Sequence, residues 1–335
     1  MAVPERPVLV APDSFKGTFR AAEVAGAIGR GLERAGLMPP DLCPVADGGE
    51  GTMDALLPRL GGDVAAAAAH DPLGRELRGG FGLVEDGGTA IVETATASGL
   101  NLVPEGERDA WAASTYGTGE LIAAAAQTGA AVIIVAVGGS ATSDGGAGAL
   151  EAIAEAGGLG GARLVVLCDV RTPFEDAPKV FGPQKGADAE MVRRLEQRLA
   201  ALAAGWPRDP RGVPMTGCAG GLSGGLWAVH GATLEPGAPW VLDALDFDAR
   251  MRASRAVITG EGKLDEQTLQ GKLVGEIGTR ARQSGVPLHA IVGTDDLDRF
   301  GKRMIDLMRV IEATDLAALE AAGEALGHEL AEGLA

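Results

Sequence analysis

A glycine-rich stretch at residues 138–146 combines residue types that bind anions. It follows an apolar, mostly β-branched run at 131–137, which is typical of a strand buried on both faces of a sheet. Glycine lets backbone N–H groups turn toward an anion, and serine and threonine add hydroxyl donors. We therefore predict a phosphate-binding loop, and its contact residues are Gly138, Gly139, Ser140, Thr142, Asp144 and Gly145. In this loop Asp144 could bind Mg²⁺ or handle a proton, and an ordinary strand-to-helix turn is the alternative interpretation.

Acidic and basic side chains also follow other predicted strands. In open α/β sheets, ligands bind beyond the carboxyl ends of the strands, so these positions are candidates for chemistry. They are Asp13, Ser14 and Lys16 after a strand at 7–11, Asp47 and Glu50 after a strand at 42–45, Asp169 near the end of a strand at 163–170, and Lys263 and Asp265 after a strand at 256–259. Lys185 lies in an irregular segment from which it could reach a ligand. A third glycine-rich segment, 217–225, could bind a ligand or allow close packing of helices.

The elements that must position these residues predict an α/β fold with two domains. Both ends of the chain alternate buried strands with amphipathic helices, whereas short alternating runs at 62–93 predict an antiparallel meander. Neither end alone has the roughly four to six strands of a typical sheet. We therefore expect residues 1–62 plus 246–335 to form one discontinuous, Rossmann-like domain with a parallel sheet. Residues 63–245 would form an inserted mixed α/β domain, with the site between the two.

Composition and charge disfavour several classes of partner. The 335 residues carry a formal net charge of −17, which argues against a nucleic acid or an anionic membrane surface. The aliphatic runs are too short to span a bilayer and the first residues do not resemble a signal peptide, so we expect a cytoplasmic protein. The 3 cysteines form no CxxC pair, which fits a reducing compartment without a zinc site. A monomer and a homodimer are both compatible with the sequence.

Motifs spread over nearly the whole chain resemble those of the glycerate kinase family, which includes bacterial D-glycerate 2-kinases. They appear in the order that the family has. They are APDSFKGT at 11–18, PVADGGEGT at 44–52, DPLG at 71–74, ASGL at 97–100, YGTGELI at 116–122, GGSATSDGGAG at 138–148, CDV at 168–170, FGPQKGA at 181–187 and ITGEGKLD at 258–265. The resemblance implies two α/β domains, one of them Rossmann-like, with the active site between them.

Some features depart from the family's pattern. The stretch between the GGAG loop and the CDV strand is shorter, because only residues 149–162 fill it. Ser143 stands where many members have asparagine, and the sequence Lys272-Leu273-Val274 lacks the proline often found after that lysine. These departures leave the carboxylates and lysines of the main motifs in place.

The resemblance implies ATP-dependent phosphorylation of D-glycerate to 2-phosphoglycerate, with Mg²⁺ as the metal. Phosphoryl transfer needs positioning and charge neutralisation above all, which suits these residue types. The 138–146 loop and Lys16 or Lys185 would contact phosphates. Asp144 or Asp47 would bind the metal.

The same resemblance implies roles for the remaining candidates. Asp169 or Asp265 would accept the hydroxyl proton, and the catalytic set would be Lys16, Asp169 and Asp265. The residues expected to bind the substrate are Asp13, Ser14, Asp47, Glu50, Arg171, Lys263 and Lys272. Of these, the arginine and the lysines would hold the glycerate carboxylate.

Other functions remain open on the sequence. Within the same class, the 3-hydroxyl of D-glycerate or a related small hydroxy acid could be the acceptor. A nucleotide-dependent oxidoreductase is a remote alternative, which the lack of a GxGxxG after the first strand weakens. A non-catalytic sensor of small acids is another, which the carboxylates at several strand ends disfavour.

Overall fold

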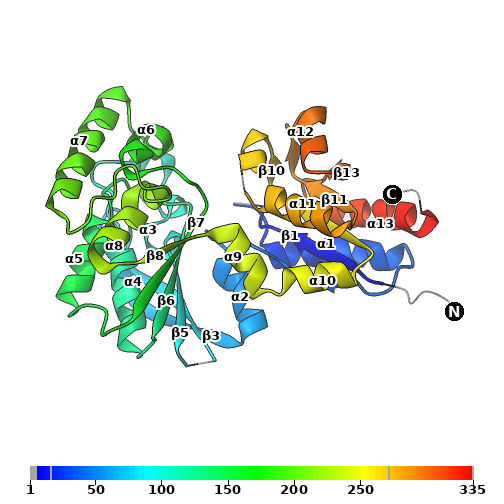
Figure 1. The fold of residues 1–335 in the computed structure, drawn as a ribbon, viewed down its shortest axis with the longest axis horizontal. Coiled ribbons are helices and arrows are strands. Elements are labelled where there is room, and N and C mark those ends of the chain that lie inside the picture. The colour runs from blue at the N-terminus through cyan, green and yellow to red at the C-terminus, as the bar shows by residue number, and fades with distance from the viewer. Residues whose placement is uncertain (1–5, 16, 86, 271, 334–335) are drawn as a thin grey trace. The chain divides into compact units, whose positions relative to one another are not determined.

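The computed structural model describes residues 6–15, 17–85, 87–270 and 272–333. The chain forms two compact units (Figure 1). Unit 1 comprises Met1–Asp47, Asp54–Leu56 and Ala238–Ala335, and unit 2 comprises Gly48–Met53 and Leu57–Gly237. The domain boundaries expected after residues 62 and 245 stay a prediction. Among the described residues, no helix has the length and apolar character needed to cross a membrane.

Unit 1 is built on a parallel sheet to which both ends of the chain contribute. Its strands lie in the order β13-β11-β9-β1-β2. They are β1 (Val8–Pro12), β2 (Asp41–Leu42), β9 (Ala256–Gly260), β11 (Leu288–Val292) and β13 (Leu307–Glu312). Each neighbouring pair is parallel, and Leu9 of β1 is in register with Val257 of β9. The predicted Rossmann-like parallel sheet from both chain ends is therefore confirmed.

Helices cover both faces of this sheet. They are α1 (Ala21–Arg34), α9 (Gly237–Ala244), α10 (Phe247–Ala253), α11 (Leu273–Ser284), α12 (Arg299–Met304) and α13 (Leu316–Glu332). Ile291 of β11 packs in one apolar cluster with α1 and α13, whereas Ala290 and Val292 pack in another with α11. Such alternation places successive side chains on opposite faces. The helices α1 and α13 approach closely, because a Cβ at Gly31 would lie 2.1 Å from the carbonyl oxygen of Glu320.

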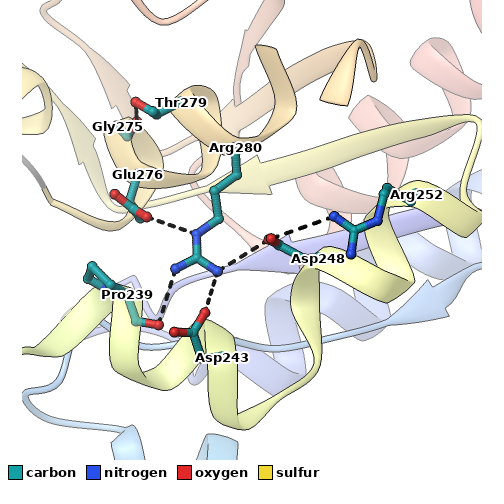
Figure 2. A network of polar contacts seen from close by, with 8 residues as sticks. All are labelled: Pro239, Asp243, Asp248, Arg252, Gly275, Glu276, Thr279 and Arg280. Atoms are coloured by element: carbon teal, nitrogen blue, oxygen red, sulfur yellow. Dashed lines mark hydrogen bonds and ion pairs between the residues drawn. The ribbon is translucent and has the colours of Figure 1, made fainter. Parts of the chain in front are cut away.

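A charged network joins α9 and α10 to α11 (Figure 2). Arg280 of α11, whose side chain is 13% exposed, lies 2.6 Å from Asp243, 3.2 Å from Asp248 and 2.8 Å from Glu276. Its guanidinium also donates to the carbonyl oxygen of Pro239 at 3.3 Å. These contacts hold the first residues that return to unit 1 against the helix that begins at Leu273.

Unit 2 is built on a mixed sheet with the order β3-β4-β5-β6-β7-β8. The strands are β3 (Gly62–His70), β4 (Glu76–Val84), β5 (Thr89–Glu93), β6 (Val132–Val137), β7 (Arg163–Cys168) and β8 (Thr233–Pro236). β3, β4 and β5 pair antiparallel, which confirms the meander, and the remaining pairs are parallel. Unit 2 therefore has the predicted mixed α/β character. β7 ends one residue before Asp169, two residues earlier than the run at 163–170 predicts.

The helices of unit 2 are α3 (Ala95–Ser98), α4 (Tyr116–Gln127), α5 (Ala147–Glu155), α6 (Ala177–Phe181), α7 (Ala189–Gly205) and α8 (Leu222–His230). The helix α2 (Thr52–Leu60) is divided, with Asp54–Leu56 in unit 1 and its other residues in unit 2. Ile133 and Val135 of β6 pack in one cluster with Leu121 of α4, Ile153 of α5 and Leu226 of α8. Figure 1 shows these three helices beside the strands of the sheet. The core places the C-terminal end of β6, and hence the 138–146 loop, at the start of α5.

Candidate functional site

A cavity of about 520 Å³ opens at the C-terminal ends of the unit 1 strands. From β1 the chain runs to β2 on one side, whereas β9, β11 and β13 extend the sheet on the other side. The strand order therefore reverses between β1 and β9, and open α/β sheets bind ligands at such a point. Asp13 follows β1 and donates its N–H to the carbonyl oxygen of Gly260 at 2.8 Å, which joins the two strand ends.

The cavity brings together most of the candidates predicted in this unit. Its lining includes Asp13, Ser14, Asp47, Lys263, Asp265 and Lys272. Lys16 lies outside the described residues. Lys263 forms an ion pair with Asp296 at 2.9 Å and lies 4.0 Å from Asp265. The Ser14 hydroxyl is buried and has no hydrogen-bond partner in the described part of the chain, so a ligand in the cavity would satisfy it.

Glu261 also lines this cavity, and the sequence analysis did not select it. It follows β9 in the same motif as Lys263 and Asp265, so the strand-end rule that found those residues applies to it equally. Burial raises the pKa of Glu261 to about 7, and the charges of Asp265 and Asp47 act in the same direction. A hydrogen bond from Thr268 and the charge of Lys272 oppose the shift without cancelling it.

The second region is the 138–146 loop of unit 2, between β6 and α5. In the residues that the structure describes, no acceptor is present for the N–H groups of Gly139, Ser140, Thr142 and Ser143. The neighbouring N–H of Ala141 donates to Ser98 at 2.9 Å, and this bond holds the loop. The hydroxyl of Ser143 is also buried without a partner among the described residues. A row of backbone donors of this kind is a cradle for an anion.

Lys185 lies against this loop and is only 2% exposed. Its Nζ donates to Ser140 Oγ at 3.0 Å and to the carbonyl oxygen of Thr142 at 2.5 Å. Burial lowers the pKa of Lys185 to about 8, although the charges of Asp144 and Asp169 favour the protonated form. No carboxylate lies within ion-pair distance of Lys185 among the described side chains, and a buried cation of this kind attracts an anionic ligand.

Asp144 anchors the loop and does not point to a ligand. Its carboxylate accepts from the N–H and the hydroxyl of Thr115, each at 2.8 Å. It also accepts from the N–H groups of Gly146 at 3.1 Å and Gly148 at 3.2 Å. These donors belong to the N-terminal ends of α4 and α5, so Asp144 joins the two helices. Both carboxylate oxygens therefore already accept hydrogen bonds, and the donor hydrogens occupy the positions that a cation would need.

Glu50 and Asp169 lie beside the loop. A Cβ built on Gly139 would lie 3.7 Å from Glu50 Oε2, and one built on Gly138 would lie 3.7 Å from Asp169 Oδ2. Gly138 also packs on Gly49, because the same Cβ would lie 2.9 Å from its Cα. Arg171 is exposed, and the structure gives no contact between its side chain and the loop within the described residues.

The third glycine-rich segment serves packing. The helix α8 already begins at Leu222, so 217–225 is not one loop. Gly145 donates its N–H to the carbonyl oxygen of Gly220 at 3.0 Å. A Cβ at Gly220 would lie 2.0 Å from the carbonyl oxygen of Thr142, so only glycine allows this approach. The segment packs against the 138–146 loop at Thr142 and Gly145.

Comparisons with known proteins identify the family of the chain. The sequence matches the profile described as "Glycerate kinase family" over residues 8–157 and 156–329. It is 39% identical over 331 residues to the glycerate kinase of Bacillus subtilis strain 168, and the alignment covers 87% of this chain and 86% of that protein. It is 36% identical over 340 residues to the glycerate 2-kinase of Escherichia coli K12, with 89% and 88% covered.

A solved structure gives the same result for the fold. The crystal structure of a putative glycerate kinase 2 from Salmonella typhimurium LT2 superimposes with a TM-score of 0.82 at 32% identity, over 98% of this chain and 99% of that one. The matched stretches of the family profile meet inside 149–162, the segment expected to be shorter than in relatives. With a profile match and relatives over most of its length, the chain belongs to the glycerate kinase family.

Proposed function

We propose that this enzyme transfers the γ-phosphoryl group of ATP to the 2-hydroxyl of D-glycerate and releases 2-phosphoglycerate and ADP. Family membership supports the reaction class, and the Escherichia coli relative carries the name glycerate 2-kinase. The observation that carries the proposal is the pairing of unoccupied loop N–H groups with the buried cation of Lys185. Phosphoryl transfer depends mainly on fixed donors and positive charge around the phosphates, and this pairing supplies both.

In this proposal the two regions have different tasks. The N–H groups of the 138–146 loop and the Lys185 ammonium hold phosphate oxygens. Lys272 and Lys263 of the unit 1 cavity hold the glycerate carboxylate. Asp13 accepts hydrogen bonds from the glycerate hydroxyls, and Ser14 accepts hydrogen bonds from them or donates to them. Lys16 and Asp169 remain in the proposed catalytic set, with Asp169 beside the 138–146 loop, and Glu50 remains a proposed substrate-binding residue.

Mg²⁺ belongs to the proposal with Asp47 as its ligand. Asp144 does not fit, because its oxygens already accept from N–H and O–H donors. Asp47 is 5% exposed and lines the cavity with Asp13, and hard carboxylate oxygens suit Mg²⁺. The described residues contain no group of three or more metal-binding side chains, but Mg²⁺ in kinases usually takes one or two carboxylates plus substrate phosphates. The ion would neutralise charge on the transferring group.

The remaining parts of the proposal concern place and assembly. We retain an active site in which the nucleotide-binding and glycerate-binding residues act together in a cleft between the domains. We also retain the cytoplasm as the location, and a monomer or homodimer as the assembly.

A coupled assay tests the proposal and the position of phosphorylation. The protein is mixed with Mg-ATP and D-glycerate, and ADP release is followed. Enolase in a parallel reaction converts 2-phosphoglycerate directly to phosphoenolpyruvate, whereas 3-phosphoglycerate reacts only after a mutase is added. We expect phosphoenolpyruvate without the mutase. A signal that requires the mutase would move the product to the 3-position, and ADP release that never depends on D-glycerate would overturn the proposal.

A further inference from the structure

Glu261 lines the unit 1 cavity directly after the carboxyl end of β9. It follows β9 at the point where the strand order reverses, and the strand-end contact between Asp13 and Gly260 fixes the residue before it. Its own carbonyl oxygen accepts from the N–H of Gly293 at 3.1 Å, which ties it to the end of β11. The backbone of Glu261 is therefore held from two strands.

The side chain is fixed through one oxygen. Glu261 Oε1 accepts from the Thr268 hydroxyl at 2.7 Å, and the same Thr268 oxygen accepts from the N–H of Asp265 at 3.2 Å. Thr268 also donates its N–H to the carbonyl oxygen of Asp265 at 3.0 Å. The other carboxylate oxygen, Oε2, has no hydrogen-bond partner in the part of the chain that the structure describes. One oxygen is thus anchored and the other is available to a ligand in the cavity.

The burial of Glu261, more than the mixed charges around it, suits a proton acceptor that works near neutral pH. Asp47 from the segment that follows β2 and Asp265 from the turn after β9 act on it with negative charge, and Lys272 at the start of α11 acts on it with positive charge. Asp13 and Lys263 line the same cavity. Burial raises the pKa of Glu261 to about 7, and general bases are most effective when their pKa is close to the working pH.

Asp265 is less suited to this role although the sequence selects it. It lies 4.0 Å from the Lys263 ammonium and its side chain is 29% exposed. The backbone of Asp265 instead helps to hold Thr268, which holds Glu261.

We propose that Glu261 is the catalytic base of this enzyme, and that Thr268 is the residue that positions it. The proposal rests on the glycerate kinase activity proposed above. In the transfer step the acceptor O–H bond breaks, its oxygen forms a bond to the γ-phosphorus, and the bond between that phosphorus and the β,γ-bridging oxygen breaks. The proton goes to Glu261 and is later released to water, while the bond electrons leave with ADP.

The first test compares Glu261→Gln with Glu266→Gln in the intact enzyme. Glu266 is an exposed glutamate in the same segment, which makes it a matched control. We expect Glu261→Gln to lower kcat by about 10²–10⁴-fold with a small change in KM for D-glycerate. Glu266→Gln should stay within about twofold of the wild type. Glu261→Gln with kcat close to the wild-type value would overturn the assignment.

The pH profile separates catalysis from a structural role. The wild-type kcat should fall below pH 7, because protonated Glu261 cannot accept a proton, and the acid limb should be absent from the residual activity of Glu261→Gln. Glu261→Asp keeps a carboxyl group and should recover part of kcat. Thr268→Val removes the hydrogen bond that lowers the pKa of Glu261, so its acid limb should move to higher pH. An acid limb that is unchanged in all three variants would contradict the proposal.

Folding and failure of the parent proposal are controlled separately. Circular dichroism and thermal melts of each variant show whether a loss of activity reflects unfolding, and Glu261→Asp provides a second carboxylate if Glu261→Gln does not fold. Wild-type protein that releases no ADP with D-glycerate would overturn the proposed function and this inference together. Active wild-type enzyme with an equally active Glu261→Gln would overturn this inference alone.

Discussion

The unit 1 cavity and the unit 2 loop offer different chemical groups to a ligand. The cavity presents charged side chains at strand ends, among them Asp13, Asp47, Glu261 and Lys272. The loop presents backbone N–H groups, and glycines with φ of 65° at Gly139, 69° at Gly145 and 84° at Gly146 turn its chain. A side-chain site can be altered one residue at a time, whereas a backbone site depends on everything that holds the loop in place.

Acidic side chains therefore have different roles in the two regions. The carboxylate of Asp144 accepts hydrogen bonds from the N-terminal ends of α4 and α5 and so joins the two helices. The carboxylate of Glu261 uses one oxygen for Thr268 and keeps the other available. Single substitutions can test this difference, because a structural carboxylate should affect stability first and a catalytic one should affect turnover first.

Within unit 2, the largest effect is expected at Lys185, which is buried against the 138–146 loop. Lys185→Met removes the positive charge that neutralises phosphate, so kcat/KM should fall by about 10²–10³-fold, the size seen for loss of one transition-state donor. Steady-state kinetics with varied ATP measures this change. The control is Lys179→Met, an exposed lysine of α6, which should leave kcat/KM almost unchanged. Equal activities of the two variants would remove the anion site from the loop.

Asp144→Asn should mainly destabilise unit 2. The amide NH₂ would face backbone N–H donors, and several charge-assisted hydrogen bonds would be lost. We expect the free energy of unfolding to fall by about 3 kcal/mol, measured by urea denaturation. Asp265→Asn in the unit 1 cavity should change it by less than about 1 kcal/mol, because that carboxylate is partly exposed. A reversed order would show that the loop does not depend on Asp144.

Acid should weaken unit 1 through His289 of β11. Its ring is fully buried, both nitrogens lack partners among the described residues, and burial lowers its pKa from 6.5 to about 4. Between these values the unfolded chain binds a proton that the folded chain does not, so stability falls as pH drops, by about 2 kcal/mol at pH 5. His289→Leu should remove this loss. Hydrogen exchange of β11 at pH 7 and pH 5 measures it, and equal acid sensitivity of both proteins would contradict the assignment.

The sequence predicts well what depends on local pattern. The parallel strands from both chain ends and the 62–93 meander follow from apolar periodicity, and the strand-end rule selects the residues that meet in the unit 1 cavity. Strand β2 covers only Asp41–Leu42, although a strand at 42–45 is predicted. The predicted segment still runs along β1, because the N–H groups of Cys43 and Val45 donate to the carbonyl oxygens of Val10 and Pro12 beyond the end of β2.

Features that depend on distant partners are not accessible from the sequence. The anchoring of Asp144 requires Thr115, which reaches it only because α4 and α5 pack side by side. The raised pKa of Glu261 requires burial, together with the charges of Asp265 and Asp47, which the fold brings to the same cavity. A buried Lys185 looks the same in sequence as an exposed turn lysine. Each case needs the fold before the chemistry of the residue is known.

The smallest effect concerns what Lys185 does to stability. Its pKa is lowered from 10.5 to about 8 by burial, so at pH 7 the unfolded chain holds the proton more firmly, and the buried charge costs about 3 kcal/mol. Lys185→Met removes this cost but also loses the hydrogen bonds to Ser140 and Thr142, worth about 2 kcal/mol together. The less active variant should therefore be more stable by about 1 kcal/mol at pH 7.

The sign of that difference should reverse with pH. At pH 10 the folded protein has released the Lys185 proton and the unfolded chain has released only part of it, so most of the cost has disappeared while the hydrogen bonds remain. Lys185→Met should then be about 1 kcal/mol less stable than the wild type in urea denaturation. Lower stability of the variant at both pH values would show that the hydrogen bonds of Lys185 outweigh the cost of its buried charge even at pH 7.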